Sequence, residues 1–245
     1  MSAVLEDSGR RRRGILRELL RSLSTVLIVS GFLLVADAAV TVAWQEPVTA
    51  FLAQRQQDRL SRDLNRLDRA APSPLEVRAL SVLPTSRRRI AFLARAFKRD
   101  TKTGGALGRI KIPKLGASFV VVKGTDSGSL RKGPGLYPQT PLPGVPGTTA
   151  IAGHRTTYLA PFRHIDRLKR GDTIELHMPY GDFTYSVQEH RIVDPSDIGV
   201  IRGVGYPRLV LSACHPLYSA AKRIVVFARL VRTVSRGAAL HTGRS

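Results

Sequence analysis

The sequence predicts a mainly β domain that closes into a barrel, preceded by one membrane-spanning helix and a partly helical stalk. From Leu107 onward, short runs of β-branched residues alternate with Gly, Pro and Asp turn residues. About eight such runs occur, and short strands separated by frequent turns are typical of closed or partly closed barrels. Before Leu107, the chain has one long apolar run, followed by apolar residues at helical spacing.

The apolar run extends from Leu23 to Trp44 and follows a cluster of arginines. It has roughly 20 residues, the length that crosses about 30 Å of hydrocarbon. Asp37 lies in its second half, where a carboxylate reaches the interface at lower cost, and Trp44 suits that interface. Because positive residues stay on the cytoplasmic side, we expect residues 1–22 in the cytoplasm, a single pass at residues 23–44, and the rest of the chain outside the cell.

Two other interpretations of this run are open. Ala36-Asp37-Ala38 fits the small-residue pattern of a signal cleavage site, which would make the run a cleaved secretory signal. The run is long for the core of a signal, so an uncleaved anchor is favoured. A buried helix of a soluble domain is the weakest interpretation, because the run has no polar face.

Residues 45–105 are predicted to form a stalk or linker that raises the next domain from the membrane. Between Glu46 and Arg69, leucines recur at helical spacing, and Pro72 and Pro74 end that pattern. The following residues are basic and mixed in character, so partial disorder is an alternative to helix.

The barrel is predicted over residues 106–234, and a flexible tail over residues 235–245. Helical turns are expected at Leu130 and at residues 161–168. The strand patterns are Arg109–Ile112, Ser118–Val122, Thr148–Ile151, Thr173–Met178, Phe183–Val187, Glu189–Val193, Leu209–Ala213 and Ile224–Val231.

Cys214 is the only cysteine, so the chain has no internal disulfide. Apolar residues lead into it, and Pro216 ends the pattern, which predicts a strand with the thiol at its end. A second strand pattern opens at Arg223 after a short loop. Such a loop makes the two strands antiparallel neighbours, and the Arg223 guanidinium would then lie close to the thiol. A lone cysteine is either a structural residue or a nucleophile.

His154 favours the nucleophile, because it opens a loop directly after a strand that ends at Gly153. A thiolate that attacks a carbonyl, an imidazolium that protonates the leaving amine and a guanidinium that stabilises the oxyanion together suit acyl transfer. His215 would face the opposite way from Cys214 if the strand continued, so we rank it lower. The remaining histidines have no metal-ligand spacing, and we expect neither a metal nor a cofactor.

The formal net charge of +21 indicates an anionic neighbour: nucleic acid, a lipid headgroup surface or an acidic polymer. The positive excess is spread over both halves of the chain. No arginine-rich stretch alternates with aromatic residues, as a base-stacking surface would. With a predicted span near the N-terminus, a membrane or a wall polymer is favoured over nucleic acid.

The residues from about Leu107 to Val231 resemble the sortases, which are membrane-anchored cysteine transpeptidases of Gram-positive bacterial surfaces. The runs His154–Tyr158 and Tyr218–Arg223 look most like class E, the housekeeping-type group of actinobacteria. The markers are Gly108–Pro113, Gly133–Tyr137, Pro143-Gly144, Gly147, Ile151–Tyr158, Val210–Cys214 and Arg223. Singly these markers are weak, but their order behind an N-terminal anchor is a strong signal.

The resemblance implies an eight-stranded sortase-type β-barrel and a catalytic set of Cys214, His154 and Arg223. Cys214 would cleave the Thr–Gly bond of a C-terminal sorting signal and form a thioester, which an amine of the peptidoglycan precursor would release. Surface proteins with such signals would be the substrates. Tyr137 matches a loop tyrosine linked to a preference for LAxTG over LPxTG signals. Ser212 and Ala213 are expected beside it in the substrate groove.

The resemblance is incomplete in the strand before the cysteine. The usual motif is Thr-Leu-x-Thr-Cys, whereas Val210 and Ala213 replace its two threonines here. These departures affect substrate preference and rate more than the reaction class. They also keep an alternative open, namely a non-catalytic, membrane-tethered barrel that binds an anionic cell-wall polymer.

Overall fold

The computed structural model describes residues 3–43 and 47–240 and divides them into two units, which we describe separately. The first unit is the helix α1 (Ala3–Ala43). Its segment Arg17–Val40 has 24 residues with a mean hydropathy of 2.1, and its apolar residues are not buried by the rest of the protein. Length and composition are therefore those of a membrane span. Trp44, expected at the membrane interface, lies outside the described residues.

The predicted stalk is helical over most of its length. It contains α2 (Pro47–Arg69), α3 (Pro74–Ser81) and α4 (Ser86–Asp100). Ser73 and Glu76 form a reciprocal capping box at the start of α3, with Pro74 at the first helical position. Thr85 caps α4 by accepting a hydrogen bond from the backbone N–H of Arg88.

These helices also pack against the barrel, a contact that the sequence pattern does not predict. Leu60 and Leu64 of α2 join a buried cluster with strand residues such as Val120. The side chain of Gln57 bonds both the backbone N–H and the carbonyl of Val120. Leu80 of α3, together with apolar residues of α4, belongs to the main core. The segment is thus part of the same compact unit as the barrel, and not a separate spacer.

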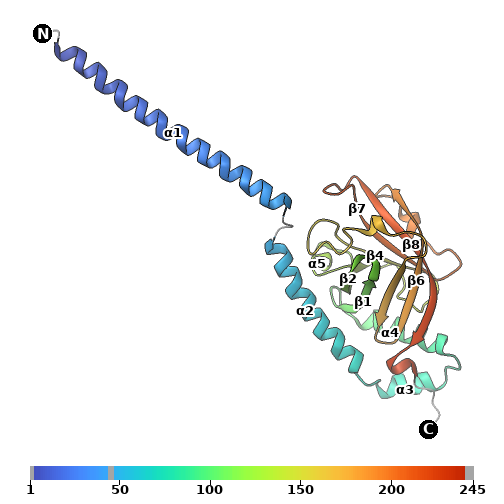
Figure 1. Cartoon of the computed structure of the whole chain (residues 1–245). Coiled ribbons are helices and arrows are strands. Elements are labelled where there is room, and N and C mark those ends of the chain that lie inside the picture. The colour runs from blue at the N-terminus through green and yellow to red at the C-terminus, as the bar shows by residue number, and fades with distance from the viewer. Residues whose placement is uncertain (1–2, 44–46, 241–245) are drawn as a thin grey trace. The chain divides into compact units, whose positions relative to one another are not determined.

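The barrel closes in the order β1-β2-β3-β4-β7-β8-β6-β5, and Figure 1 shows its strands with α4 against them. Neighbouring strands are antiparallel except for the parallel pairs β2–β3 and β4–β7. The strands are β1 (Ala106–Ile112), β2 (Ala117–Lys123), β3 (Gly135–Leu136), β4 (Thr148–Ala152), β5 (Thr173–Met178), β6 (Gly181–Val193), β7 (Arg208–His215) and β8 (Lys222–Ser235).

The prediction of eight strands is confirmed, but two of them are divided differently. The patterns predicted as Phe183–Val187 and Glu189–Val193 are one continuous strand, β6, whose register shifts at Gln188. A bulge of one residue interrupts the period-2 pattern without ending the strand. The eighth strand is β3, whose two residues are too few for any periodicity to show.

The predicted flexible tail is folded over its described part. Strand β8 continues to Ser235, and the 3-10 helix η4 (Gly237–Leu240) buries Ala239 completely in the main core. The Arg89 side chain donates to the carbonyl of Ala239. The expected helical turns are present as α5 (Ser127–Leu130) and η2 (Ile165–Arg167). Residues 241–245 lie outside the described range.

The two faces of β7 have different surroundings. Leu209, Leu211 and Ala213 point into the main core. Val210 belongs to a second cluster on the other face, with Phe227 and the partly buried residues Tyr137, Val200 and Ile201 packed in it. The 3-10 helix η3 (Ile198–Ile201) therefore covers part of the outer face of β7. Because side chains alternate along a strand, Ser212 and Cys214 share this outer face with Val210.

Candidate active site

The candidate site is built around Cys214, near the end of β7. The thiol is not bonded to another cysteine, and the residue is half-buried. Strand β7 lies between β4 on one side and β8 on the other. Both neighbours bring a candidate catalytic residue to the same end of the barrel.

Arg223 is directly opposite Cys214 in the antiparallel β7–β8 pair, as the sequence predicts. Residues opposite each other in such a pair project from the same face, with Cα atoms about 4.5–5.5 Å apart. Nη1 of Arg223 donates to the carbonyls of Ala220 and Lys222, at 2.9 and 3.0 Å. The β7–β8 loop thus holds the guanidinium next to the end of the strand that carries the thiol.

His154 reaches the site from the other side. Strands β4 and β7 are parallel with Ala152 paired to Ser212, and the N–H of Gly153 donates to the Ser212 carbonyl at 3.0 Å. If the same register continues for two more residues, His154 lies beside Cys214. A parallel pair brings the carboxyl ends of both strands to one edge, so residues 60 positions apart in the sequence become neighbours.

Burial lowers the pKa of His154 below its usual value, and the positive charge of Arg131 lowers it further. The imidazole contacts the Tyr158 ring, with ring centroids 5.0 Å apart. The Arg131 guanidinium lies 6.0 Å from the same tyrosine ring. His154 is therefore held mainly in its neutral form at neutral pH. Tyr158 also starts a run of three residues with positive φ, a strained conformation that is common near functional sites.

We expect the Arg131→Gln substitution to raise the pKa of His154, because it removes a cation that opposes protonation of the ring. Burial is the larger cause of the lowered pKa and remains, so the pKa should return only part of the way toward about 6.5. NMR titration of the histidine ring in both proteins measures this change. Arg170→Gln removes an exposed charge that does not act on His154 and is the matched control. An unchanged pKa in Arg131→Gln would show that burial acts alone.

Arg155 connects the loop that bears His154 to the end of β7. Its side chain is only 4% exposed, and Nη1 lies 3.0 Å from Nδ1 of His215. A guanidinium only donates, so Nδ1 of His215 must accept, and the proton of the neutral ring lies on Nε2. Arg155 also donates to the Arg163 carbonyl and pairs with Asp166, at 3.2 and 2.9 Å. Arg155 lies in the motif Ile151–Tyr158, but the sequence did not predict a role for it. Its position next to the candidate catalytic His154 was the feature of the sequence that could have indicated a role for Arg155.

We expect Arg155→Met to lower the free energy of unfolding by about 2 kcal/mol, because it removes charge-assisted hydrogen bonds from a buried group. Asp166 is 46% exposed, so solvent screens that ion pair, and most of the loss should come from the other contacts. Urea unfolding followed by circular dichroism measures the change. Arg167→Met, an exposed substitution in the same loop, should leave stability within about 0.5 kcal/mol. Equal stability of the two variants would contradict this account.

Two of the three predicted groove residues lie together on the outer face. The hydroxyls of Tyr137 and Ser212 are 2.9 Å apart and hydrogen-bonded. Ala213, by contrast, is 4% exposed, pairs with Ile224 and points into the main core. Its side chain faces away from Ser212 and Cys214 and does not join the site, because neighbouring residues of a strand point to opposite faces.

Of the other histidines, His215 contacts Arg155, and His177 lies elsewhere on the barrel. His177 bonds Asp182 and Glu175 on the barrel surface, at 2.9 and 3.2 Å. No group of three His, Cys, Asp or Glu residues with metal-binding geometry occurs among the described residues.

Comparisons with known proteins show which family the barrel is similar to. A family model described as "Sortase domain" matches residues 110–231. Sortase D of Bacillus subtilis (strain 168) is 35% identical over 134 residues, which are 53% of this chain and 66% of that protein. The chain spans between 41% and 66% of the length of the curated relatives it matches.

Solved structures of sortases are also similar to this chain. Sortase E from Streptomyces avermitilis matches with a TM-score of 0.51 and 32% identity, over 55% of this chain and 93% of that one. Sortase E1 from Streptomyces coelicolor, with a tripeptide in the active site, matches with a TM-score of 0.52 and 25% identity, over 54% and 91%.

Proposed function

The chain belongs to the sortase family, and from that premise we propose that it is a membrane-anchored cysteine transpeptidase that acts on C-terminal sorting signals. One observation carries the proposal. In the strand register, Arg223 pairs directly opposite Cys214, and β4, which ends two residues before His154, pairs in parallel with the strand that carries Cys214.

In the first half of the reaction, the thiolate of Cys214 attacks the carbonyl carbon of the signal's threonine. The C–S bond forms and the Thr–Gly C–N bond breaks. The imidazolium form of His154 donates its proton to the departing glycine amine. The guanidinium of Arg223 stabilises the negative charge that develops on the carbonyl oxygen. The product is a thioester between Cys214 and the substrate protein.

In the second half, an amine of the peptidoglycan precursor attacks the thioester carbon. Neutral His154 accepts the proton of the attacking amine, the C–N bond forms, and Cys214 leaves as the thiolate. The lowered pKa of His154 suits this step, because the neutral base is the abundant form. The same pKa keeps the imidazolium scarce in the first step, so acylation is expected to be the slower half.

We further propose that α1 anchors the protein in the cell membrane as a single span. The basic N-terminal residues would then be cytoplasmic and the catalytic barrel extracellular, where sorting signals and wall precursors meet it. The support is the 24-residue apolar stretch in α1 and the arginines that precede it in the sequence.

The test is to incubate the full chain, in detergent micelles, with LAxTG and LPxTG peptides and candidate amines, and to follow the products by mass spectrometry. The expected result is a mass increase on the protein equal to the peptide's N-terminal acyl part, mapped to Cys214, followed by a peptide–amine product. Intact peptides with every amine would reject the transpeptidase and favour a non-catalytic barrel. An ester or amide adduct elsewhere on the chain would reject the assignment of the nucleophile.

We expect Tyr137→Phe to reduce the preference for LAxTG over LPxTG peptides by about two- to tenfold, the value of one neutral hydrogen bond of about 0.5–1.5 kcal/mol. The substitution removes the hydroxyl that bonds Ser212. Ser212→Ala should have a similar effect, and the double variant should lose less than the sum. Tyr206→Phe, which breaks a hydrogen bond to Gln188, is the control. Ratios of kcat/KM measure the preference, and additive effects would show that the two hydroxyls act independently.

A further inference from the structure

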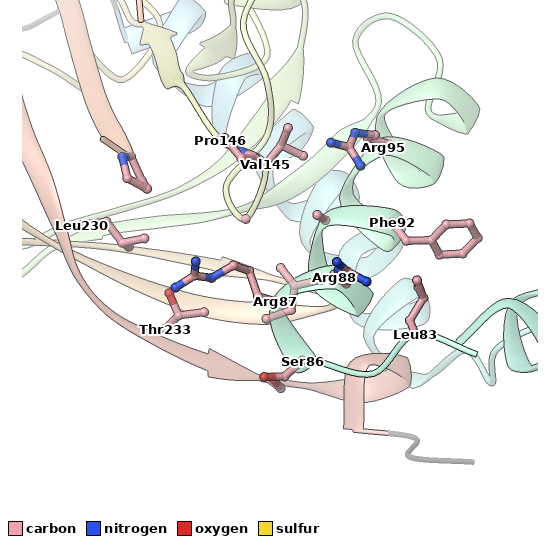
Figure 2. Close-up of a pocket in the computed structure, with 15 residues that line it drawn as sticks. Leu83, Ser86, Arg87, Arg88, Phe92, Arg95, Val145, Pro146, Leu230 and Thr233 are labelled. Carbon is pink, nitrogen blue, oxygen red and sulfur yellow. The ribbon is translucent and has the colours of Figure 1, made fainter. Parts of the chain in front are cut away.

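A cavity of about 850 Å³ lies between α4, the loop before β4 and the second half of β8 (Figure 2). We call it the α4 pocket. Its lining includes Pro146 and Pro207, which precede β4 and β7 in the sequence, whereas His154 and Cys214 lie at the far ends of those strands. The α4 pocket is therefore at the opposite end of the β4–β7 pair from the candidate active site.

Three arginines of α4 line this pocket, namely Arg87, Arg88 and Arg95. Figure 2 shows them spread along the helix, with Arg87 toward Leu230 and Thr233 and Arg95 toward Val145. All three are exposed, and no aspartate or glutamate lines the pocket. Within residues 17–40 and 49–240, none of the three forms an ion pair. The pocket thus has concentrated positive charge that no ion pair of these described residues neutralises.

The position of two of these arginines adds a second argument. Arg87 and Arg88 lie in the first turn of α4, which contains no acidic residue. The N-terminus of a helix carries a partial positive charge and backbone N–H groups without intrahelical partners, so acidic residues are favoured there and basic ones are not. Arg89 in the same turn is used by the fold, since it donates to the carbonyls of Leu83 and Ala239. Among the residues whose side chains are described, no hydrogen bond of the fold uses the side chains of Arg87 and Arg88 in this way. An anion in the pocket would relieve the repulsion between them and the helix N-terminus.

The rest of the lining is mainly apolar, with Phe92, Val145, Pro146 and Leu230 among its residues. Val82, next to the lining residue Leu83, is 76% exposed. A purely hydrophilic anion such as a polyol phosphate polymer would leave this apolar surface unused. Cations on one wall and apolar surface on the other match a molecule that is both anionic and amphiphilic.

We propose that the α4 pocket binds the headgroup and glycerol region of an anionic phospholipid. The inference rests on the proposed membrane anchoring and not on the proposed transpeptidation. An anchored chain is covalently attached to the bilayer, so it meets lipid headgroups at high effective concentration. The arginines would bind the phosphate, and Phe92, Val145 and Leu230 would contact the glycerol and first acyl carbons.

The test uses the full chain in nanodiscs of phosphatidylcholine alone, or of phosphatidylcholine with phosphatidylglycerol, and reads amide hydrogen exchange by mass spectrometry. Phosphatidylglycerol is expected to slow exchange severalfold in residues 82–88 and 143–147. The R87Q/R88Q/R95Q variant should lose this protection. A variant with R59Q, R62Q and R69Q removes the same charge from exposed positions of α2 and should keep it. Whether the chain enters discs of phosphatidylcholine alone tests the proposed membrane anchoring independently of the pocket.

Three results would overturn the proposal. The first is no protection by phosphatidylglycerol in a chain that enters the discs. The second is equal loss of protection in both triple variants, which would show general attraction between the basic protein and an anionic surface. The third is the same protection by soluble poly(glycerol phosphate) added to phosphatidylcholine discs, which would assign the pocket to a wall polymer instead.

Discussion

Cys214→Ala is expected to abolish the acyl-enzyme and to reduce peptide cleavage to the background level, because no other group in the site can form the thioester. Cys214 is the only thiol in the chain, so the result is easy to interpret. Iodoacetamide should modify the wild-type protein once and the variant not at all. Mass spectrometry of the protein after incubation with an LAxTG peptide measures the acyl-enzyme directly.

The fold should survive this substitution. Cys214 is half-buried at the end of β7 and outside the main core, so the free energy of unfolding should change by less than about 1 kcal/mol. Cys214→Ser keeps a nucleophilic atom of similar size but is a much weaker nucleophile at neutral pH, and it should also fail. Normal cleavage by Cys214→Ala would remove Cys214 from the mechanism.

Arg223→Ala is expected to lower kcat/KM by roughly 10²–10³-fold, equivalent to about 2.7–4 kcal/mol of transition-state stabilisation, as for the loss of one oxyanion donor. The register places Arg223 directly opposite Cys214, where a donor to the carbonyl oxygen is needed. Arg223→Lys should recover only part of the loss, since an ammonium is a point charge without the planar fork of donors. Steady-state kinetics with the preferred peptide measures both variants.

Lys222→Ala is the matched control for Arg223. Lys222 precedes Arg223 on the same strand, pairs with His215 in the register and forms an exposed ion pair with Asp194. Its removal should change kcat/KM by less than threefold, because an exposed ion pair is worth about 0–1 kcal/mol. Comparable losses in the Lys222 and Arg223 variants would indicate a general effect of positive charge in this loop and not a specific oxyanion contact.

Much of the fold was readable from the sequence because it depends on local patterns. Short β-branched runs between turn residues located seven of the eight strands, and the short loop after Pro216 predicted the pairing of the Cys214 strand with the strand that opens at Arg223. The patterns failed where local information is weak. Strand β3 is two residues long, and the continuity of β6 through Gln188 depends on its partner β8 rather than on its own residues.

The packing of the N-terminal helices was not readable in the same way. The leucine spacing of α2 predicts a helix, but an amphipathic face does not reveal its partner. For the residues after Pro74, partial disorder was an open alternative to helix. Leu60 and Leu64 pack on β1 and β2, and Leu80 is buried in the main core. Likewise, Ala239 is buried in the main core, although the sequence around it predicts a flexible tail.

The sequence by itself determined which chemistry the site can contain, because residue types and a strand-ending cysteine are local facts. It also determined the order of the strands that carry Cys214 and Arg223, since a six-residue loop joins them. Only the tertiary structure decided that the strand before His154 pairs with the Cys214 strand, that Ala213 faces the core and that Arg155 contacts His215 at the end of β7. The physical reason is that parallel pairing and barrel closure join residues far apart in the chain, and no local pattern specifies which distant strand becomes a neighbour.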